Sequence, residues 1–98
     1  MKIIRKPMLR QQCHRNVAVL YARGEIDSIV DGYAFNGYKW LEHTWGLKDK
    51  NIIETTVRFK DYDGVILNEA DTRLFLFNEL WFSNFKRDRK IWLSWARR

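Results

Sequence analysis

The spacing of apolar residues predicts helical segments at both ends of the chain and strands in its middle. Near the N-terminus, apolar residues recur at helical steps over residues 9–22, and Gly24 follows where a helix C-terminal glycine belongs. The recurring positions are Leu9, Cys13, Val17 and Leu20. Val17, Val19 and Tyr21 also fall at every second position, so a strand over residues 16–22 remains an alternative. Further apolar residues over 26–30 predict one or two more helical turns, which end at Gly32.

The middle of the chain carries strand and turn signals. Asn36-Gly37 lies between aromatic and apolar neighbours and predicts a β-hairpin in which both turn residues adopt positive φ. Residues 52–60 alternate strictly, which predicts a half-buried strand. The face that we expect to be buried comprises Ile53, Thr55, Val57 and Phe59. A turn at residues 61–64 then leads to a returning strand that begins at residues 65–67.

The C-terminal part predicts a second helix. Asn68 or Asp71 can cap its start. One stripe at helical spacing, which we interpret as part of the core, comprises Leu74, Phe77, Trp81 and Phe85. Since 98 residues fit one domain, we expect a single compact domain over residues 1–98. Its predicted class is α+β: a small antiparallel sheet of three or four strands with helices at the N- and C-terminal ends.

Charge is distributed unevenly along the chain, which holds 18 Lys and Arg against 12 Asp and Glu. Residues 1–23 carry a net charge of +6, residues 24–72 a net charge of −5, and residues 73–98 a net charge of +5. Two arrangements are open. The basic ends can fold against the acidic middle, or they can form one positive face that binds nucleic acid or an acidic partner.

The segment 73–98 combines basic residues with aromatic rings. Trp and Arg are common anchors of protein interfaces, and aromatic rings also stack on bases. The candidate binding residues are Trp81, Lys86, Arg87, Arg89, Lys90, Trp92, Trp95, Arg97 and Arg98. This composition favours a small non-enzymatic interaction protein, of the kind that phages or mobile elements use to modulate or inhibit a larger host protein, such as a nucleic-acid-processing enzyme. Direct binding of DNA or RNA is the alternative.

Catalytic chemistry has weaker support in the sequence. Cys13, His14 and His43 contain a thiol and two imidazoles, but adjacent helical positions point about 100° apart, and the paired spacings of a zinc site are absent. A small metal-dependent nuclease is a second alternative, built on Glu54, Asp61 and Asp63. The sequence therefore predicts no catalytic residue, no metal site and no cofactor.

Three features bear on the compartment. Cys13 is the only cysteine, so no internal disulfide can form, which favours a reducing environment. No apolar run approaches the roughly 18–20 residues that span a bilayer. The first twelve residues carry positive charge but no apolar core, unlike a signal peptide. We expect a cytoplasmic protein without membrane contact, located in the host cytosol if a phage encodes it.

Overall fold

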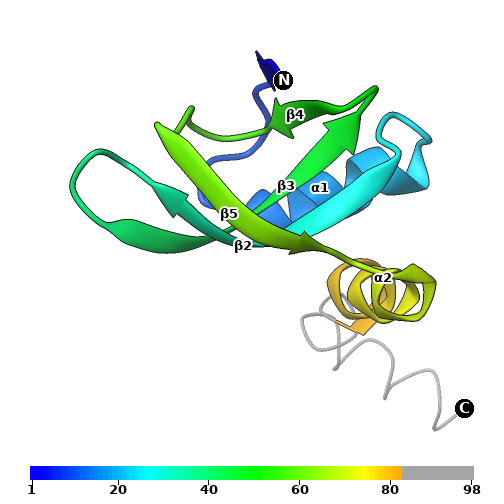
Figure 1. Ribbon diagram of the computed structural model, residues 1–98. Helices are drawn as coiled ribbons and strands as arrows, with labels where there is room; N and C mark the ends of the chain where they lie inside the picture. The colour runs from blue at the N-terminus through cyan, green and yellow to red at the C-terminus, as the bar shows by residue number, and fades with distance from the viewer. Residues whose placement is uncertain (83–98) are drawn as a thin grey trace, which may run out of the picture.

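The computed structural model describes residues 1–82, which form a five-stranded sheet with two α-helices packed against it (Figure 1). The elements are β1 (Ile3–Arg5), α1 (Cys13–Ala22), β2 (Ser28–Phe35), β3 (Trp40–Lys48), β4 (Asn51–Glu54), β5 (Asp61–Ile66), α2 (Glu69–Leu76) and the π-helix η1 (Phe77–Phe82). The strand order is β1-β4-β3-β2-β5, with β1 parallel to β4 and all other pairs antiparallel. The α+β class is confirmed, but the sheet is mixed and larger than predicted, and a strand rather than a helix comes first.

The first helix begins four residues later than predicted. Gln11 has a φ of 57°, which an α-helix cannot contain, so α1 starts at Cys13. Gly24 follows the helix with a φ of 72°, as predicted for its C-terminal end. The further helical turns predicted up to Gly32 are wrong, because residues 28–32 belong to β2 and residues 26–27 form neither helix nor strand. This strand is central in the sheet and covered on both faces, so its apolar residues do not simply alternate.

Tight turns connect the three central antiparallel strands. The hairpin at Asn36-Gly37 is confirmed, and Gly37 has a φ of 96°. Asn36 itself does not adopt positive φ, contrary to prediction. Its side-chain oxygen instead accepts hydrogen bonds of 2.8 Å from the backbone N–H groups of Tyr38 and Lys39. A second hairpin between β3 and β4, which the sequence analysis missed, turns through two residues of positive φ at 49–50.

The predicted strand over residues 52–60 is wrong beyond Glu54. The chain leaves the sheet there because the Glu54 carboxylate accepts a 3.0 Å hydrogen bond from the backbone N–H of Thr56, which closes a local turn. Val57 is 55% exposed instead of buried. Residues 61–66, predicted to begin with a turn, form strand β5 along their whole length.

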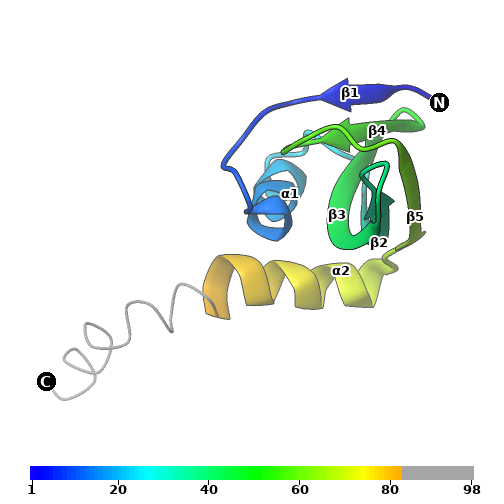
Figure 2. The same ribbon diagram turned by 90° about the vertical axis from the view of Figure 1, so that its left-hand side faces the viewer.

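The two faces of the sheet carry separate apolar clusters. On one face α1 packs against the sheet, and α2 packs against α1 and adds Phe75 and Leu76 to the same cluster (Figure 2). The buried residues of that cluster are Val17, Leu20, Ile26, Ile29 and Ile53. The other face buries Val30, Trp45 and Ile52, with Tyr62 packed against them. Ile52 and Ile53 therefore serve opposite faces of one short strand, which explains why both are buried.

The start of α2 follows the sequence prediction, but its buried face does not. Asn68 is the N-cap, and its side-chain oxygen accepts a 2.8 Å hydrogen bond from the backbone N–H of Asp71. The prediction that a stripe of this helix lies in the core is wrong, because Leu74 is 59%, Phe77 53% and Trp81 67% exposed. Its fourth member, Phe85, lies outside the described residues. The neighbouring side chains Phe75 and Leu76 face the core instead. Moreover, η1 is a π-helix, which has more residues per turn than an α-helix. Residues at α-helical spacing therefore do not share one face there.

The basic N-terminal segment pairs only in part with the acidic middle. Lys6 forms an ion pair with Glu25, and Arg23 lies 3.8 Å from the same carboxylate. Arg5 and Arg10 form no ion pair with any residue in the described part of the chain. Among residues 1–82, no helix has the length and apolar character needed to cross a membrane.

Candidate active site

A buried histidine and a buried glutamate form a direct ion pair at the centre of the sheet. Nε2 of His43 lies 2.8 Å from Oε1 and 3.0 Å from Oε2 of Glu54. The side chains are 5% and 0% exposed. Pairing of Gly46 with Ile53 sets the register of β3 and β4 and brings Glu54 to the same face as His43. A buried pair of charges is costly unless other groups complete its hydrogen bonds, so its surroundings matter.

The Glu54 carboxylate is completed by donors from two further residues. The hydroxyl of Tyr62 donates to Oε1 at 2.9 Å, and the backbone N–H and hydroxyl of Thr56 each donate to Oε2 at 3.0 Å. Burial alone would raise the pKa of Glu54, but the hydrogen bonds from His43 and Thr56 outweigh burial and lower it. The carboxylate is therefore held ionised and oriented toward the imidazole.

The imidazole of His43 and the thiol of Cys13 line the same groove. Since Glu54 occupies Nε2 of His43, Nδ1 is the ring nitrogen that can hydrogen-bond the sulfur. Burial alone would raise the pKa of the Cys13 thiol, but hydrogen bonds with His14, His43 and the backbone of Thr44 outweigh it and lower the pKa from 9.0 to about 6. Burial would likewise lower the pKa of His43, but hydrogen bonds with Cys13 and Glu54 raise it to about 9. Near neutral pH the pair is a thiolate and an imidazolium.

Local structure holds the thiol in this position. Cys13 is the first residue of α1, where the positive end of the helix dipole favours a thiolate. The buried side-chain amide of Asn16 donates to the carbonyl of Leu9 at 2.7 Å and to the hydroxyl of Thr55 at 3.3 Å. These bonds tie the start of α1 to the chain directly after Glu54. These hydrogen bonds thereby fix the start of α1 relative to the end of β4, where Glu54 lies.

Cys13 and His43 open onto a groove of about 780 Å³. This volume falls within the range of small-molecule sites in proteins. Its walls are largely apolar, with contributions from Met8, Leu41, Val57 and Phe59. A thiolate paired with an imidazolium, an ionised carboxylate behind it and a groove in front are the parts that nucleophilic catalysis requires.

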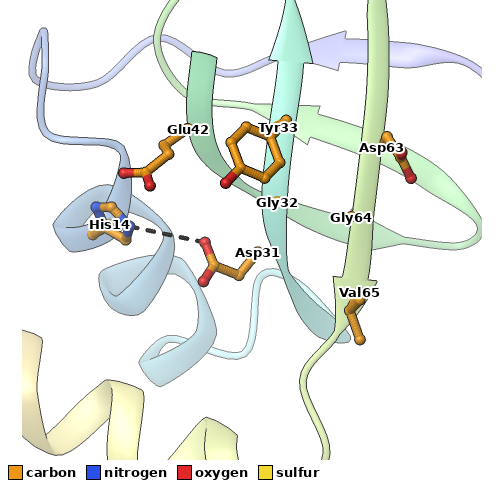
Figure 3. Close-up of a pocket in the computed structure, with 8 residues that line it drawn as sticks. All are labelled: His14, Asp31, Gly32, Tyr33, Glu42, Asp63, Gly64 and Val65. Atoms are coloured by element: carbon orange, nitrogen blue, oxygen red, sulfur yellow. Dashed lines mark ion pairs between the residues drawn. The ribbon is translucent and has the colours of Figure 1, made fainter. Parts of the chain in front are cut away.

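His14 faces a second, smaller hollow of about 480 Å³ (Figure 3). Its Nε2 lies 4.0 Å from Oδ1 of Asp31, and its Nδ1 lies 3.8 Å from the Cys13 sulfur. Hydrogen bonding with Cys13 raises the pKa of His14 above its usual value. Glu42 lines both this hollow and the groove, so the two lie next to each other on either side of that residue.

The structure groups the catalytic candidates differently from the way the sequence analysis did. Cys13 and His43 do come together, and His14 contacts the same sulfur. Glu54, which the sequence placed in a metal set, is instead the partner of His43. From the sequence we weighed the angle between Cys13 and His14 along the helix and the missing ligand spacings of a zinc site. The sequence could not show that β3 presents His43 to the first residue of that helix, because strand register depends on distant contacts.

The remaining candidates of the sequence do not form a site within the described residues. Among residues 1–82 no group of three His, Cys, Asp or Glu residues could hold a metal ion, so Glu54, Asp61 and Asp63 do not converge as a metal site. Of the predicted binding residues, Trp81 is exposed on η1. The others, Lys86, Arg87, Arg89, Lys90, Trp92, Trp95, Arg97 and Arg98, lie outside the described residues.

Comparisons of the chain with protein-family models, with curated proteins and with solved structures returned no match.

Proposed function

We propose that the protein is an acyl-transfer enzyme of the hydrolase type that uses Cys13 as its nucleophile. His43 acts as the general acid and base, and Glu54 orients and stabilises its imidazolium form. The observation that supports this proposal is that one groove is lined by the Cys13 thiol and by the His43 imidazole, which contacts a buried, fully hydrogen-bonded carboxylate. The same set of roles recurs on unrelated folds, where geometry rather than sequence position identifies it.

The reaction proceeds in two balanced steps. The Cys13 thiolate attacks the substrate carbonyl carbon and forms a carbon–sulfur bond. The His43 imidazolium gives its proton to the leaving amine or alcohol as the carbon–nitrogen or carbon–oxygen bond breaks. In the second step, neutral His43 takes a proton from water, which attacks the thioester. The carbon–sulfur bond then breaks, a carboxylic acid leaves, and the thiolate–imidazolium pair is restored.

The start of α1 supplies a donor for the negative charge that develops on the carbonyl oxygen. The N–H group of Cys13 lies in the first turn of the helix, where backbone N–H groups have no intrahelical acceptor. It belongs to the same residue as the attacking sulfur, and it therefore lies near the carbonyl under attack. Such a donor typically contributes about 10²–10³-fold in rate.

The test is hydrolysis of a panel of fluorogenic ester and amide substrates by the wild-type chain and by Cys13→Ser. Loss of the thiolate should reduce the rate by at least about a thousandfold, because the hydroxyl that replaces it is a far weaker nucleophile at neutral pH. Circular dichroism of both proteins controls for folding. Hydrolysis that Cys13→Ser retains at the wild-type rate would exclude Cys13 as the nucleophile.

A second candidate is the non-enzymatic interaction protein that the sequence favours, docking on a larger protein such as a nucleic-acid-processing enzyme, or on DNA or RNA. The observation in its favour is the exposed apolar surface of α2 and η1 at Leu74, Phe77 and Trp81. The two functions respond to different variants. Trp81→Ala should weaken capture of such a partner and leave hydrolysis intact, whereas Cys13→Ser should do the reverse.

A further inference from the structure

Two arginines line the groove beside Cys13 without a carboxylate partner among the described residues. Nε of Arg5 donates to the carbonyl of Thr56 at 3.0 Å, which holds this guanidinium against the chain that follows Glu54. Arg10 comes from the segment just before α1. Neither forms an ion pair with a residue of the described range. The remaining guanidinium N–H groups are therefore available to an anion.

The apolar part of the groove lies next to these charges. Val57 is 55% exposed and lines the groove together with Phe59, Leu41 and Met8. An exposed β-branched side chain beside an arginine suits a ligand that is apolar along its body and negatively charged at one position. A uniformly apolar ligand would leave the guanidinium groups without a counter-charge.

The hollow on the other side of Glu42 has the opposite charge. Asp31, Glu42 and Asp63 line it, and His14 is its only basic lining residue (Figure 3). An anionic group placed there would face these carboxylates at short range, which is unfavourable. The groove and the hollow thus carry charges of opposite sign on either side of Glu42, and this difference orients a charged ligand along the site.

We propose that the substrate is a peptide that carries an apolar side chain next to an acidic one, bound in the groove with its carboxylate toward Arg5 and Arg10. This proposal rests on the proposed function, since it names the substrate class of the same site. Glu42 lies at the boundary between groove and hollow and keeps the anion on the side of the arginines.

The test uses three peptide probes of equal length that alkylate Cys13: iodoacetyl-Leu-Asp-amide, iodoacetyl-Leu-Asn-amide and iodoacetyl-Leu-Lys-amide. In each case the Cys13 sulfur displaces iodide, and because Cys13 is the only cysteine, intact mass reports its modification directly. We expect the Asp probe to react fastest and the Lys probe slowest. The rates of the Asp and Lys probes should differ by about two- to fivefold, the size expected of one exposed ion pair.

Variants at the two arginines decide the origin of this preference. Arg10→Glu and Arg5→Glu, each checked for folding by circular dichroism, should abolish or invert the ratio between the Asp and Lys probes. Lys50→Glu makes the same change of charge in the β3–β4 turn, outside the groove lining, and should keep the wild-type ratio. Equal rates for the three probes, or a ratio that survives both arginine substitutions, would overturn the proposal.

The same probes separate this proposal from the catalytic one. His43→Ala should slow all three probes by a common factor, because it removes the partner of the thiolate but not the arginines. If His43→Ala leaves the rates unchanged, the catalytic proposal fails while the charge preference still stands. If the preference is absent but His43→Ala slows every probe, only the substrate class is wrong.

Discussion

The imidazole of His43 and the carboxylate of Glu54 lie 2.8 Å apart, and the two side chains are 5% and 0% exposed. Nε2 of His43 and both carboxylate oxygens of Glu54 are engaged in hydrogen bonds. In the described part of the chain, no buried side-chain nitrogen or oxygen lacks a hydrogen-bond partner. A completed polar network of this kind holds one geometry and depends on every member.

Loss of the buried carboxylate should strongly destabilise the fold. Glu54→Ala leaves His43 buried without its counter-charge and Thr56 and Tyr62 without their acceptor. Breaking one partner of a buried pair typically costs about 3–5 kcal/mol. Urea unfolding measures the loss. The matched control is Asp63→Ala on an exposed position of β5, which should change stability by no more than about 0.5 kcal/mol.

The reactivity of Cys13 should follow a thiol pKa far below 9.0. Because the pKa of Cys13 is lowered to about 6, the rate of alkylation by iodoacetamide should rise as pH increases through about 6 and level off above it. Acyl transfer should also fall as pH rises through about 9, where His43 loses the proton that the leaving group needs. These apparent values belong to the coupled pair rather than to either residue.

Replacement of either imidazole should move this titration upward. His14→Ala and His43→Ala each remove a hydrogen bond that lowers the thiol pKa, so the midpoint of alkylation should shift toward 9.0 in both variants. The shift is measured from alkylation rates between pH 5 and pH 10, at constant ionic strength. A midpoint that stays near 6 in both variants would mean that neither imidazole stabilises the thiolate.

The Tyr62 hydroxyl should contribute to both stability and activity through Glu54. It donates to the carboxylate at 2.9 Å and accepts the backbone N–H of Phe59 at 3.1 Å. Tyr62→Phe leaves that N–H and one carboxylate oxygen short of a partner, which should cost about 1–3 kcal/mol in urea unfolding. It should also lower kcat, because the carboxylate that orients His43 loses a donor. Tyr38→Phe, at a position 89% exposed, should change neither quantity.

Ile53 and Val57 lie on either side of Glu54 in the sequence and differ sharply in exposure. Ile53 is 6% exposed and packs beneath α1, whereas Val57 is 55% exposed in the groove wall. Ile53→Asp buries an unpaired charge and should cost several kcal/mol or prevent folding, while Val57→Asp should cost about 1 kcal/mol or less. Equal losses in chemical denaturation would instead support a strand that continues past Glu54.

The features that the sequence predicted well depend on residues close together in the chain. Gly24 at the end of α1, the hairpin at Gly37 and the cap at Asn68 each follow from local backbone preferences and side-chain hydrogen bonds. The α+β class follows from the same local patterns. The errors arose where the spacing of apolar residues was taken to decide burial, since Val57 and Leu74 were predicted to be buried but are exposed. Ile52 and Ile53 are both buried because β4 lies between two covered faces.

The sequence by itself determined the thiol, the imidazoles and the carboxylates that are available, and the local turns that shape the chain. Only the tertiary structure decided which of them meet. Cys13, His43 and Glu54 lie on a helix and two strands, and they come together because β3 and β4 pair in one register and because Asn16 anchors α1 beside them. A shift of one residue in that register would turn Glu54 to the opposite face, and no local pattern specifies it.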